Sequence, residues 1–443
     1  MMAGLTRQAL KRSPWAFFGP ASTQALAATV VIASLCAVHS LNAGGLDPAT
    51  RAVLSDSGIL DVAALFLPIS IYLSIIIVGL TMTASIARQA RDIALVRAVG
   101  ASPAQVRRAV ALQAAIVAVP ATLAGVPLGV LAGRAWIGGL ASHGVIPDTV
   151  AFHAYPAALP IALAITVGTS LLGALIAAIR PSRVRPAVAL AETGAPRRRI
   201  GGVRTVIGLV LVAGGVALSI WVSGLDAEQA DVAGLGVLLA MCVGAGLLGP
   251  ALLRVAAPFA RLLGPSGVLA ADNLAVRAKA YSGALVPLTL AIAFAAVKVI
   301  VFSTTTHVTG VPLDAGDRWL EVTGTGVYAA FAAAAALNSL ITVVLARRRD
   351  LAVLRLAGGT TARALGVVIC EALSVTGTAI LVAAAVAATT ALPLLHTALG
   401  TWTVYAPAGF WVAGVLGVAA LVLAGTVIPA ALVLRTPPIE AVG

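Results

Sequence analysis

The chain has 443 residues, of which 60% are hydrophobic and only 10% are charged, and its mean hydropathy is +1.04. Soluble domains carry about 25% charged and 45–50% apolar residues, so this composition excludes an ordinary soluble protein. The net charge of +13 would suggest nucleic acid in a soluble protein, but the positions of the charges along this chain indicate a membrane surface instead.

Apolar runs of about 18 residues or more are long enough to cross the hydrocarbon core as helices. The first run follows a basic stretch but precedes no cleavage site, so we interpret it as a retained helix rather than a signal peptide. We expect an all-α polytopic membrane protein. Ten runs qualify as spans: Ala21–Leu41, Val62–Ile86, Ala109–Leu131, Ala158–Ile179, Thr205–Val222, Val232–Leu253, Ser282–Ser303, Gly326–Leu345, Ala364–Ala388 and Ala408–Leu434.

The positions of Lys and Arg orient these spans, because cytoplasmic loops carry an excess of both residues. With ten spans, the two termini lie on the same side of the membrane. If that side is the cytoplasm, 25 of the 29 basic residues lie inside and ten of the 16 acidic residues lie outside. We therefore expect a multi-pass protein of the cell (inner or plasma) membrane with cytoplasmic termini. Its basic face suits anionic lipid headgroups and gives no reason to invoke nucleic acid.

The chain has few of the residue types that commonly serve in catalysis or metal binding. Cys36, Cys242 and Cys370 each lie inside an apolar run and form no readable disulfide framework or metal motif. Histidines fall toward the outer side on different loops, which leaves a metal or proton-sensing cluster as an alternative. They are His39, His143, His153, His307 and His396. We find no catalytic or metal-ligand spacing, and we expect a non-catalytic chain with no metal and no cofactor of its own.

An internal repeat duplicates one cytoplasmic segment. Residues 91–102 read RDIALVRAVGAS, and residues 349–360, which lie 258 positions later, read RDLAVLRLAGGT. Each segment directly follows one span and leads into the next. We expect the preceding span to continue out of the membrane as a helix that ends at Gly100, or at Gly358 in the second copy.

A new helix is then expected to start in each copy. In the first copy Ser102 is the N-cap, Pro103 is the first helical residue and Gln105 can close a capping box; Thr360 is the N-cap in the second copy. The result is a rigid elbow of two helices below the membrane, present twice. The simpler alternative is a positively charged loop.

The repeat extends beyond the elbows. Each copy has one span before an external loop, one span leading into the elbow and two spans after it. This predicts a first four-helix repeat at 1–190, a basic linker with two linking helices at 191–265 and a second four-helix repeat at 266–443. An even number of spans separates the copies, so they are parallel, and a pseudo-two-fold axis along the membrane normal is the natural packing.

Small residues recur at four-residue spacing in the third span and at the matching place in the second repeat. They are Gly125, Gly129 and Gly133, followed 258 positions later by Ala383, Ala387 and Ala391. Such spacing lets helix backbones approach closely, so we expect a packing stripe. The alternative is chance, because the chain is rich in alanine and glycine.

Two charged residues lie within spans and are functional candidates for that reason. Lys298 lies near a predicted outer end, where its side chain can reach the headgroups. Glu371 lies in the ninth span, opposite Gln113 in the first copy. For Glu371 we expect a pair with a cytoplasmic-side arginine.

The segment from Arg91 to Ser102 and its second copy resemble the FtsX-like permease family, also called the MacB-like or type VII ABC transporter permeases. The ends of the repeats, 186–190 (PAVAL) and 438–442 (PIEAV), are also similar to that family. The ten-span layout resembles the peptide-detoxification branch more than the four-span homodimeric branch. Relatives typically carry a sizeable extracytoplasmic domain, whereas loops 42–61 and 304–325 are short here.

The resemblance implies that each elbow is a coupling helix that docks on one subunit of a cytosolic ABC ATPase dimer, which would bind ATP and Mg. It implies this role for Arg91, Asp92, Val96, Arg97, Gly100 and Ser102, and for Arg349, Asp350, Leu354, Arg355, Gly358 and Thr360. Val96 and Leu354 would be the apolar anchors. Membrane lipids and an amphiphilic substrate would be the other partners.

The chain contains no G-x-x-x-x-G-K-S/T phosphate loop, so ATP would be hydrolysed by a separate chain. The leading hypothesis is an ABC permease that exports or expels a peptide, lipid or hydrophobic drug. One alternative is a membrane subunit that transmits force or regulates without transporting. Another is a secondary transporter with parallel repeats, although such transporters usually need several polar ligands near the membrane midplane.

Overall fold

The computed structural model describes residues 14–43, 47–56, 59–183, 202–312 and 314–435. These residues form helices and their connections, with no strand among them. Nine of the described helices are long and apolar enough to cross a membrane. The remaining predicted span lies in α4 (Ile59–Arg88), where Leu67–Gly79 forms a shorter apolar stretch. The predicted fold class is confirmed: the chain is an all-α polytopic membrane protein.

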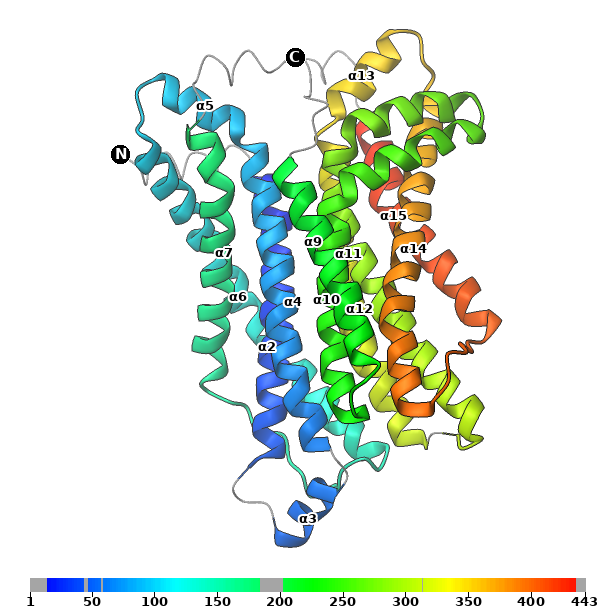
Figure 1. The fold of residues 1–443 in the computed structure, drawn as a ribbon. Coiled ribbons are helices and arrows are strands. Elements are labelled where there is room, and N and C mark those ends of the chain that lie inside the picture. The colour runs from blue at the N-terminus through cyan, green and yellow to red at the C-terminus, as the bar shows by residue number, and fades with distance from the viewer. Residues whose placement is uncertain (1–13, 44–46, 57–58, 184–201, 313, 436–443) are drawn as a thin grey trace. The chain divides into compact units, whose positions relative to one another are not determined.

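The chain divides into two compact units, which are shown together in Figure 1. Unit 1 comprises residues 1–195 and 313–327, and unit 2 comprises residues 196–312 and 328–443. In unit 1 the long helices α2, α4, α6 and α7 pack on one another, with the short helices α3 and α5 at their ends. Their bounds are α2 Pro14–Leu41, α3 Pro48–Asp56, α5 Ala90–Ala98, α6 Pro103–Ser142 and α7 Ala158–Arg183.

Unit 2 contains the second repeat and the two linking helices. Helix α10 packs on α9, α11 and α14, and the buried core lies among α10, α11, α12, α14 and α15. The bounds are α9 Gly202–Val222, α10 Ala227–Ala256, η2 Ala257–Leu263, α11 Pro265–Thr309, α12 Ala315–Leu345, α13 Arg348–Leu356, α14 Thr361–Leu399 and α15 Ala408–Arg435. The first residues of α12 belong to unit 1. The repeat ends at 186–190 and 438–442 lie outside the described residues.

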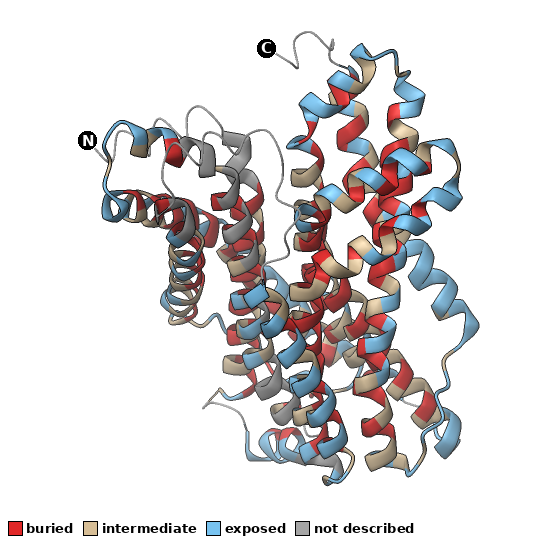
Figure 2. Cartoon of the chain, turned by 45° about the horizontal axis from the view of Figure 1, so that its top comes forward, coloured by how far each residue is buried: buried red, intermediate tan, exposed pale blue. Residues whose placement is uncertain are grey.

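Buried and exposed residues alternate along the helices with the period of a helix face, as Figure 2 shows. In unit 1, α6 approaches α2 so closely that a Cβ atom on Gly125 would lie 2.5 Å from the Ala25 carbonyl oxygen. A Cβ atom on Gly129 would lie 2.8 Å from the Cβ atom of Ile32. Since real Cβ atoms do not approach other atoms so closely, α2 can occupy this position only because α6 has glycine there. In unit 2 the matching residues Ala383, Ala387 and Ala391 are buried on α14.

A proline creates a specific polar contact between the linking helices. Pro250 has no N–H group, so the carbonyl of Gly246, one turn earlier in α10, loses its helical donor. Arg204 of α9 donates to this oxygen at 3.0 Å and to the Leu247 carbonyl at 2.9 Å. This arginine ties α9 to α10 by satisfying a carbonyl that would otherwise be unpaired in an apolar setting.

At the end of each repeat opposite its elbow, the connection between the last two long helices is bonded to the end of the first. In unit 1 the backbone N–H of His153 donates to Ser40 Oγ at 2.9 Å, and Ser40 Oγ donates back to the His153 carbonyl at 3.2 Å. In unit 2 Tyr405 and Thr304 Oγ1 make the same reciprocal pair at 3.0 and 3.1 Å. Both repeats therefore fix this connection in the same way.

The helices are longer than the predicted spans. Helix α11 has 45 residues, which at 1.5 Å per residue is about 68 Å, more than twice the thickness of the hydrocarbon core. Much of the loop expected at 304–325 is therefore helical, and the loop expected at 42–61 contains α3. Hydropathy marks where a helix leaves lipid but not where it ends. That end requires a cap, such as Gly310 in the left-handed conformation after α11.

The α2–α6 contact predicts that alanine substitutions at two glycines of α6 change the stability of the protein differently. Gly125→Ala should destabilise the protein by about 1–3 kcal/mol, because the added methyl group overpacks the contact with α2. Gly138 on the same helix has nothing within 4 Å of a built Cβ, so Gly138→Ala should be neutral or slightly stabilising through helix propensity. Thermal unfolding in detergent compares the two variants. Equal effects would show that the four-residue spacing has no packing role.

Candidate functional site: the two elbows

The first elbow is a short helix followed by a capped turn. Helix α5 ends at Ala98, and Gly100 adopts φ 105°, a left-handed conformation that glycine adopts without strain. Ser102 Oγ then accepts from the backbone N–H of Gln105 at 3.3 Å, and the Gln105 side chain accepts from the N–H of Ser102 at 2.9 Å. With Pro103 at the first helical position, this is the predicted capping box, which is confirmed.

The second elbow repeats this geometry 258 residues later. Helix α13 spans Arg348–Leu356, Gly358 has φ 90°, and Thr360 Oγ1 accepts from the backbone N–H of Arg363 at 3.2 Å. In both copies the N–H groups of residues 100 and 101, or 358 and 359, close the turn onto carbonyls of the short helix. Two segments far apart in the chain thus form the same rigid turn.

The prediction that the preceding span continues into the elbow as one helix is wrong in both copies. Helix α4 ends at Arg88 and α12 ends at Leu345, and a turn separates each from the short helix that follows. The N–H of Gln89 bonds the Ile86 carbonyl, and the N–H of Arg347 bonds the Val344 carbonyl, three residues back instead of four. This tighter bond ends the long helix and redirects the chain, so each elbow is a separate short helix.

The elbows turn one apolar side outward. Leu95 and Val353 occupy matching positions, and their exposed fractions are 48% and 56%. By contrast, Val96 and Leu354, the predicted anchors, are half-buried, and Leu354 packs against the buried cluster that contains Leu351. Val99 and Leu356 are exposed as well, at 91% and 57%. The half-buried Val96 and Leu354 stay predicted anchors, and Leu95 and Val353 are the more exposed candidates beside them.

Charged residues of the second elbow also hold it in place. Asp350 forms an ion pair with Arg277 of α11, and Arg355 donates to the Leu434 carbonyl in the last turn of α15 at 2.9 Å. Arg349 is exposed, and Arg97 is half-buried. The side chains of Arg91 and Asp92 lie outside the described set, so the expectation for them stays a prediction.

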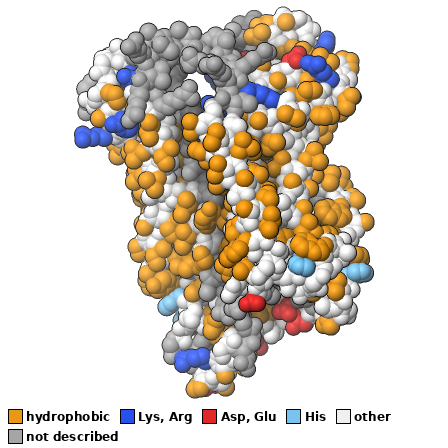
Figure 3. Space-filling view, in the orientation of Figure 1, with side chains coloured by type: hydrophobic (Ala, Val, Ile, Leu, Met, Phe, Trp, Pro, Cys, Tyr) orange, Lys and Arg blue, Asp and Glu red, His pale blue; other side chains and the backbone are white. Residues whose placement is uncertain are grey.

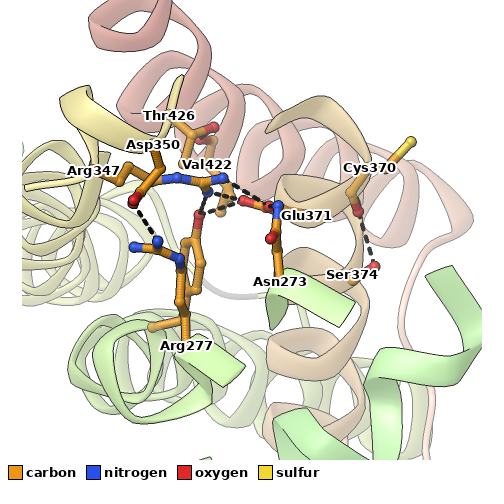
Figure 4. Close-up of polar contacts among 10 residues, drawn as sticks. Asn273, Arg277, Arg347, Asp350, Cys370, Glu371, Ser374, Val422 and Thr426 are labelled. Atoms are coloured by element: carbon orange, nitrogen blue, oxygen red, sulfur yellow. Dashed lines mark hydrogen bonds and ion pairs between the residues drawn. The ribbon is translucent and has the colours of Figure 1, made fainter. Parts of the chain in front are cut away.

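A buried polar cluster lies directly behind the second elbow (Figure 4). Arg347, in the turn between α12 and α13, pairs with Glu371 of α14 through both of its terminal nitrogens. Tyr281 of α11 donates to Glu371 Oε2 at 2.8 Å and accepts from Arg347 at 2.9 Å. Asn273 donates to Glu371 Oε1 at 3.0 Å. The cluster joins the elbow turn to α11 and α14.

Both charges of this cluster are removed from solvent: Arg347 is 2% exposed and Glu371 is 0% exposed. Burial by itself would lower the pKa of Arg347, but its hydrogen bonds to Glu371 and the charge of that carboxylate outweigh the burial and raise it. A buried pair is stabilised when hydrogen bonds satisfy its remaining polar atoms. Tyr281 and Asn273 do this for the carboxylate, whereas the buried Arg347 Nε has no hydrogen-bond partner among the described residues. Glu371 is thus paired with an arginine, as expected from the sequence.

Sequence reasoning missed three members of this cluster. In the sequence Arg347 is one of several basic residues at the end of a span, and no local pattern marks Tyr281 or Asn273. The spacing of 24 residues from Arg347 to Glu371 is a usable signal, because Gln89 and Gln113 occupy the same two positions in the first copy. No local pattern in the sequence indicates that α11 contributes Tyr281 and Asn273 to the cluster.

The other predicted residues lie elsewhere. Lys298 is half-buried in α11. Four of the histidines stack on aromatic rings: His39 on Tyr155, His143 on Trp319, His307 on Tyr405 and His396 on Trp402. Among the described residues, no group of three or more His, Cys, Asp or Glu side chains is placed to hold a metal ion.

Charge is segregated along the helices of each unit. In Figure 3 apolar side chains cover the middle of the helices, most of the visible Lys and Arg side chains lie at the elbow end, and the histidines lie toward the opposite end, where one further basic group is visible. An apolar belt between two polar ends matches a protein whose helices cross a bilayer.

A known family model matches the region of the chain that contains the first elbow and the helices on both sides of it. Residues 64–186 match the family model for the FtsX-like permease C-terminal region. This chain contains an FtsX-like permease domain. The match begins within α4, includes α5 and its turn, and ends after α7, so the segment that carried the resemblance lies inside it. The FtsX-like domain supports a permease subunit of an ABC transporter in general. No curated protein matches the chain at a significant level.

The buried cluster predicts that neutralising Glu371 alone strongly destabilises the folded protein. Glu371→Ala leaves Arg347 buried without its partner, and we expect a loss of about 3–5 kcal/mol, seen as a large drop in Tm in detergent. The control is Asp272→Ala, because Asp272 pairs with Arg261 in an exposed ion pair that should contribute only about 0–1 kcal/mol. A Tm for Glu371→Ala close to that of Asp272→Ala would show that the buried pair does not hold the fold.

Proposed function

We propose that the chain is the membrane subunit of an ABC exporter and that each of its elbows docks on one subunit of a cytosolic ATPase dimer. The observation that carries this proposal is the duplication of one rigid turn, with a positive-φ glycine and a capped helix start at the same 258-residue spacing. The FtsX-like domain that contains the first elbow supports it independently. ATP and Mg would be bound by the ATPase, and the elbow side would face the cytoplasm.

The elbow geometry suits the transmission of movement. A short helix held between a tight turn and a capped long helix moves as one body with that long helix, whereas a flexible loop would absorb the displacement. Helices α6 and α14 start directly at Ser102 and Thr360 and run for 40 and 39 residues. A displacement applied at an elbow by ATPase closure would therefore move a helix that extends through the membrane.

For the substrate we propose an amphiphile such as a peptide, a lipid or a hydrophobic drug, moved outward. Unit 1 supports this class because it combines apolar outer faces with an interior in which hydroxyl and amide groups meet between helices. Gln24 donates to Ser170 Oγ at 2.7 Å, and Thr122 and Thr166 share a hydrogen bond of 2.7 Å. Helices that already exchange polar contacts could offer the same groups to the polar part of a substrate while its apolar part stays in lipid.

The exposed apolar residues of the elbows provide the test. Leu95→Asp combined with Val353→Asp should abolish copurification of the ATPase and its stimulation by the permease, because burying a carboxylate in an apolar contact is unfavourable. The control is Leu262→Asp, which places the same charge on an 82% exposed apolar residue of η2 and should leave both readouts unchanged. Normal binding and stimulation by a correctly inserted double variant would exclude the elbows as coupling sites.

A further inference from the structure

The four long helices of unit 1 share a layer of buried polar side chains. Gln24 of α2 donates to Ser170 Oγ of α7 at 2.7 Å. Thr23, the neighbour of Gln24, donates to Thr81 Oγ1 of α4 at 3.3 Å. The layer consists of six uncharged residues that are between 0% and 6% exposed: Thr23, Gln24, Thr81, Thr122, Thr166 and Ser170.

Helix α6 joins the layer through Thr122, which shares a hydrogen bond of 2.7 Å with Thr166, one turn before the serine of α7. Gly125, about one turn further along α6, packs against the carbonyl of Ala25, which follows Gln24 in α2. The polar residues of the four helices therefore lie within about one helical turn of one another.

The layer separates two apolar clusters of unit 1. The cluster toward the elbow contains Met82, Val110 and Ala174, and the cluster toward the opposite end contains Ile32 and Ala162. At the matching level of unit 2, Ile380 stands 258 residues after Thr122, and Leu285 and Leu288 of α11 are fully buried in one continuous apolar cluster. Hydroxyl and amide groups thus replace apolar side chains in the middle of unit 1.

Gln24 is the member of the layer whose hydrogen bonding is incomplete. The hydroxyls of Thr122 and Thr166 also lie 2.8 Å from carbonyl oxygens of their own helices. Gln24 is 0% exposed, and its Oε1 has no hydrogen-bond partner among the described residues. Leaving a buried acceptor unpaired is unfavourable, whereas an apolar side chain of the same size would avoid this loss. Gln24 is therefore poorly explained by helix packing alone.

We propose that Gln24 is the binding residue of a site in unit 1 that takes a neutral hydrogen-bonding group, an amide or a hydroxyl, of an amphiphile. Gln24 Oε1 accepts from this group, and Ser170 becomes a second partner when α2 and α7 separate. The site selects against a charged group, because none of the six residues of the layer carries a charge to pair with it. That this amphiphile is the exported substrate rests on the proposed function.

Photolabelling of the purified permease in lipid nanodiscs tests the site. The probe is a fatty primary amide with a diazirine next to its head group, compared with the methyl ester and the trimethylammonium compound of the same tail. Peptides of α2 and α7 should be labelled about fivefold more by the amide, the difference that one neutral hydrogen bond makes. Equal labelling by the amide and the ester, or equal labelling of α11 and α14, would overturn the proposal.

Variants of the layer identify the residue that recognises the amide. Q24M keeps the volume of the side chain without its polar atoms, so it should remove the preference for the amide. The control is T390V in unit 2, which removes a buried hydroxyl that bonds the Val386 carbonyl of its own helix and should leave the labelling unchanged. A folded Q24M that still prefers the amide would contradict the role of Gln24. If Q24M does not fold, the three probes on the unmodified protein decide.

ATP hydrolysis by the complex with the copurified ATPase distinguishes a bound amphiphile from an exported one. The amide probe should raise hydrolysis severalfold in the unmodified complex and leave it unchanged in Q24M. Labelling of α2 and α7 without any effect on hydrolysis, or a failure of the permease to bind any ATPase, would contradict the proposed function and leave the binding site standing.

Discussion

A helix in hydrocarbon must satisfy its own backbone polar groups, and this constraint determines where the chain can change direction. Every tight turn of the described repeats lies at an end of the long helices. Each elbow turn is completed by a glycine and a capping residue of the same short segment. Gly100 and Gly358 supply the left-handed residue, and Ser102 and Thr360 cap the helix that follows. Because the turns are locally complete, they form the same shape in two different sequence contexts.

The side chains packed behind the elbow turn differ between the two repeats. In the second repeat the carboxylate of Glu371 accepts hydrogen bonds from Arg347, Tyr281 and Asn273. Such a network is directional, and its members come from α11, α14 and the turn between α12 and α13. The first repeat has the same turn, with Gln89 and Gln113 at the positions of Arg347 and Glu371.

The parts of the structure that could be predicted from the sequence are those encoded locally. Apolar runs predict the spans, and the order Ser102, Pro103, Gln105 predicts a capping box because each residue acts within one helical turn.

The helix breaks at Gln89 and Arg347 could not be predicted from the sequence, because neither residue is a helix breaker. The sequence does not show which apolar residues of the elbow are most exposed, since a nine-residue helix with several apolar positions does not define its own rotation. Its rotation is set by burial of Ile93 and of Leu351. Tyr281 and Asn273 could not be found for a related reason: they reach Glu371 from a helix about a hundred residues away.

Contact of both elbows with the ATPase can be tested directly by site-specific photo-crosslinking in intact cells. A photoreactive amino acid would replace Leu95 or Val353 in the elbows, or Val308 near the opposite end of α11 as a control with a similar exposed fraction. We expect adducts of the permease with an ABC ATPase from both elbow positions and none from Val308. ATPase adducts from Val308, or their absence from both elbow positions in an active transporter, would contradict it.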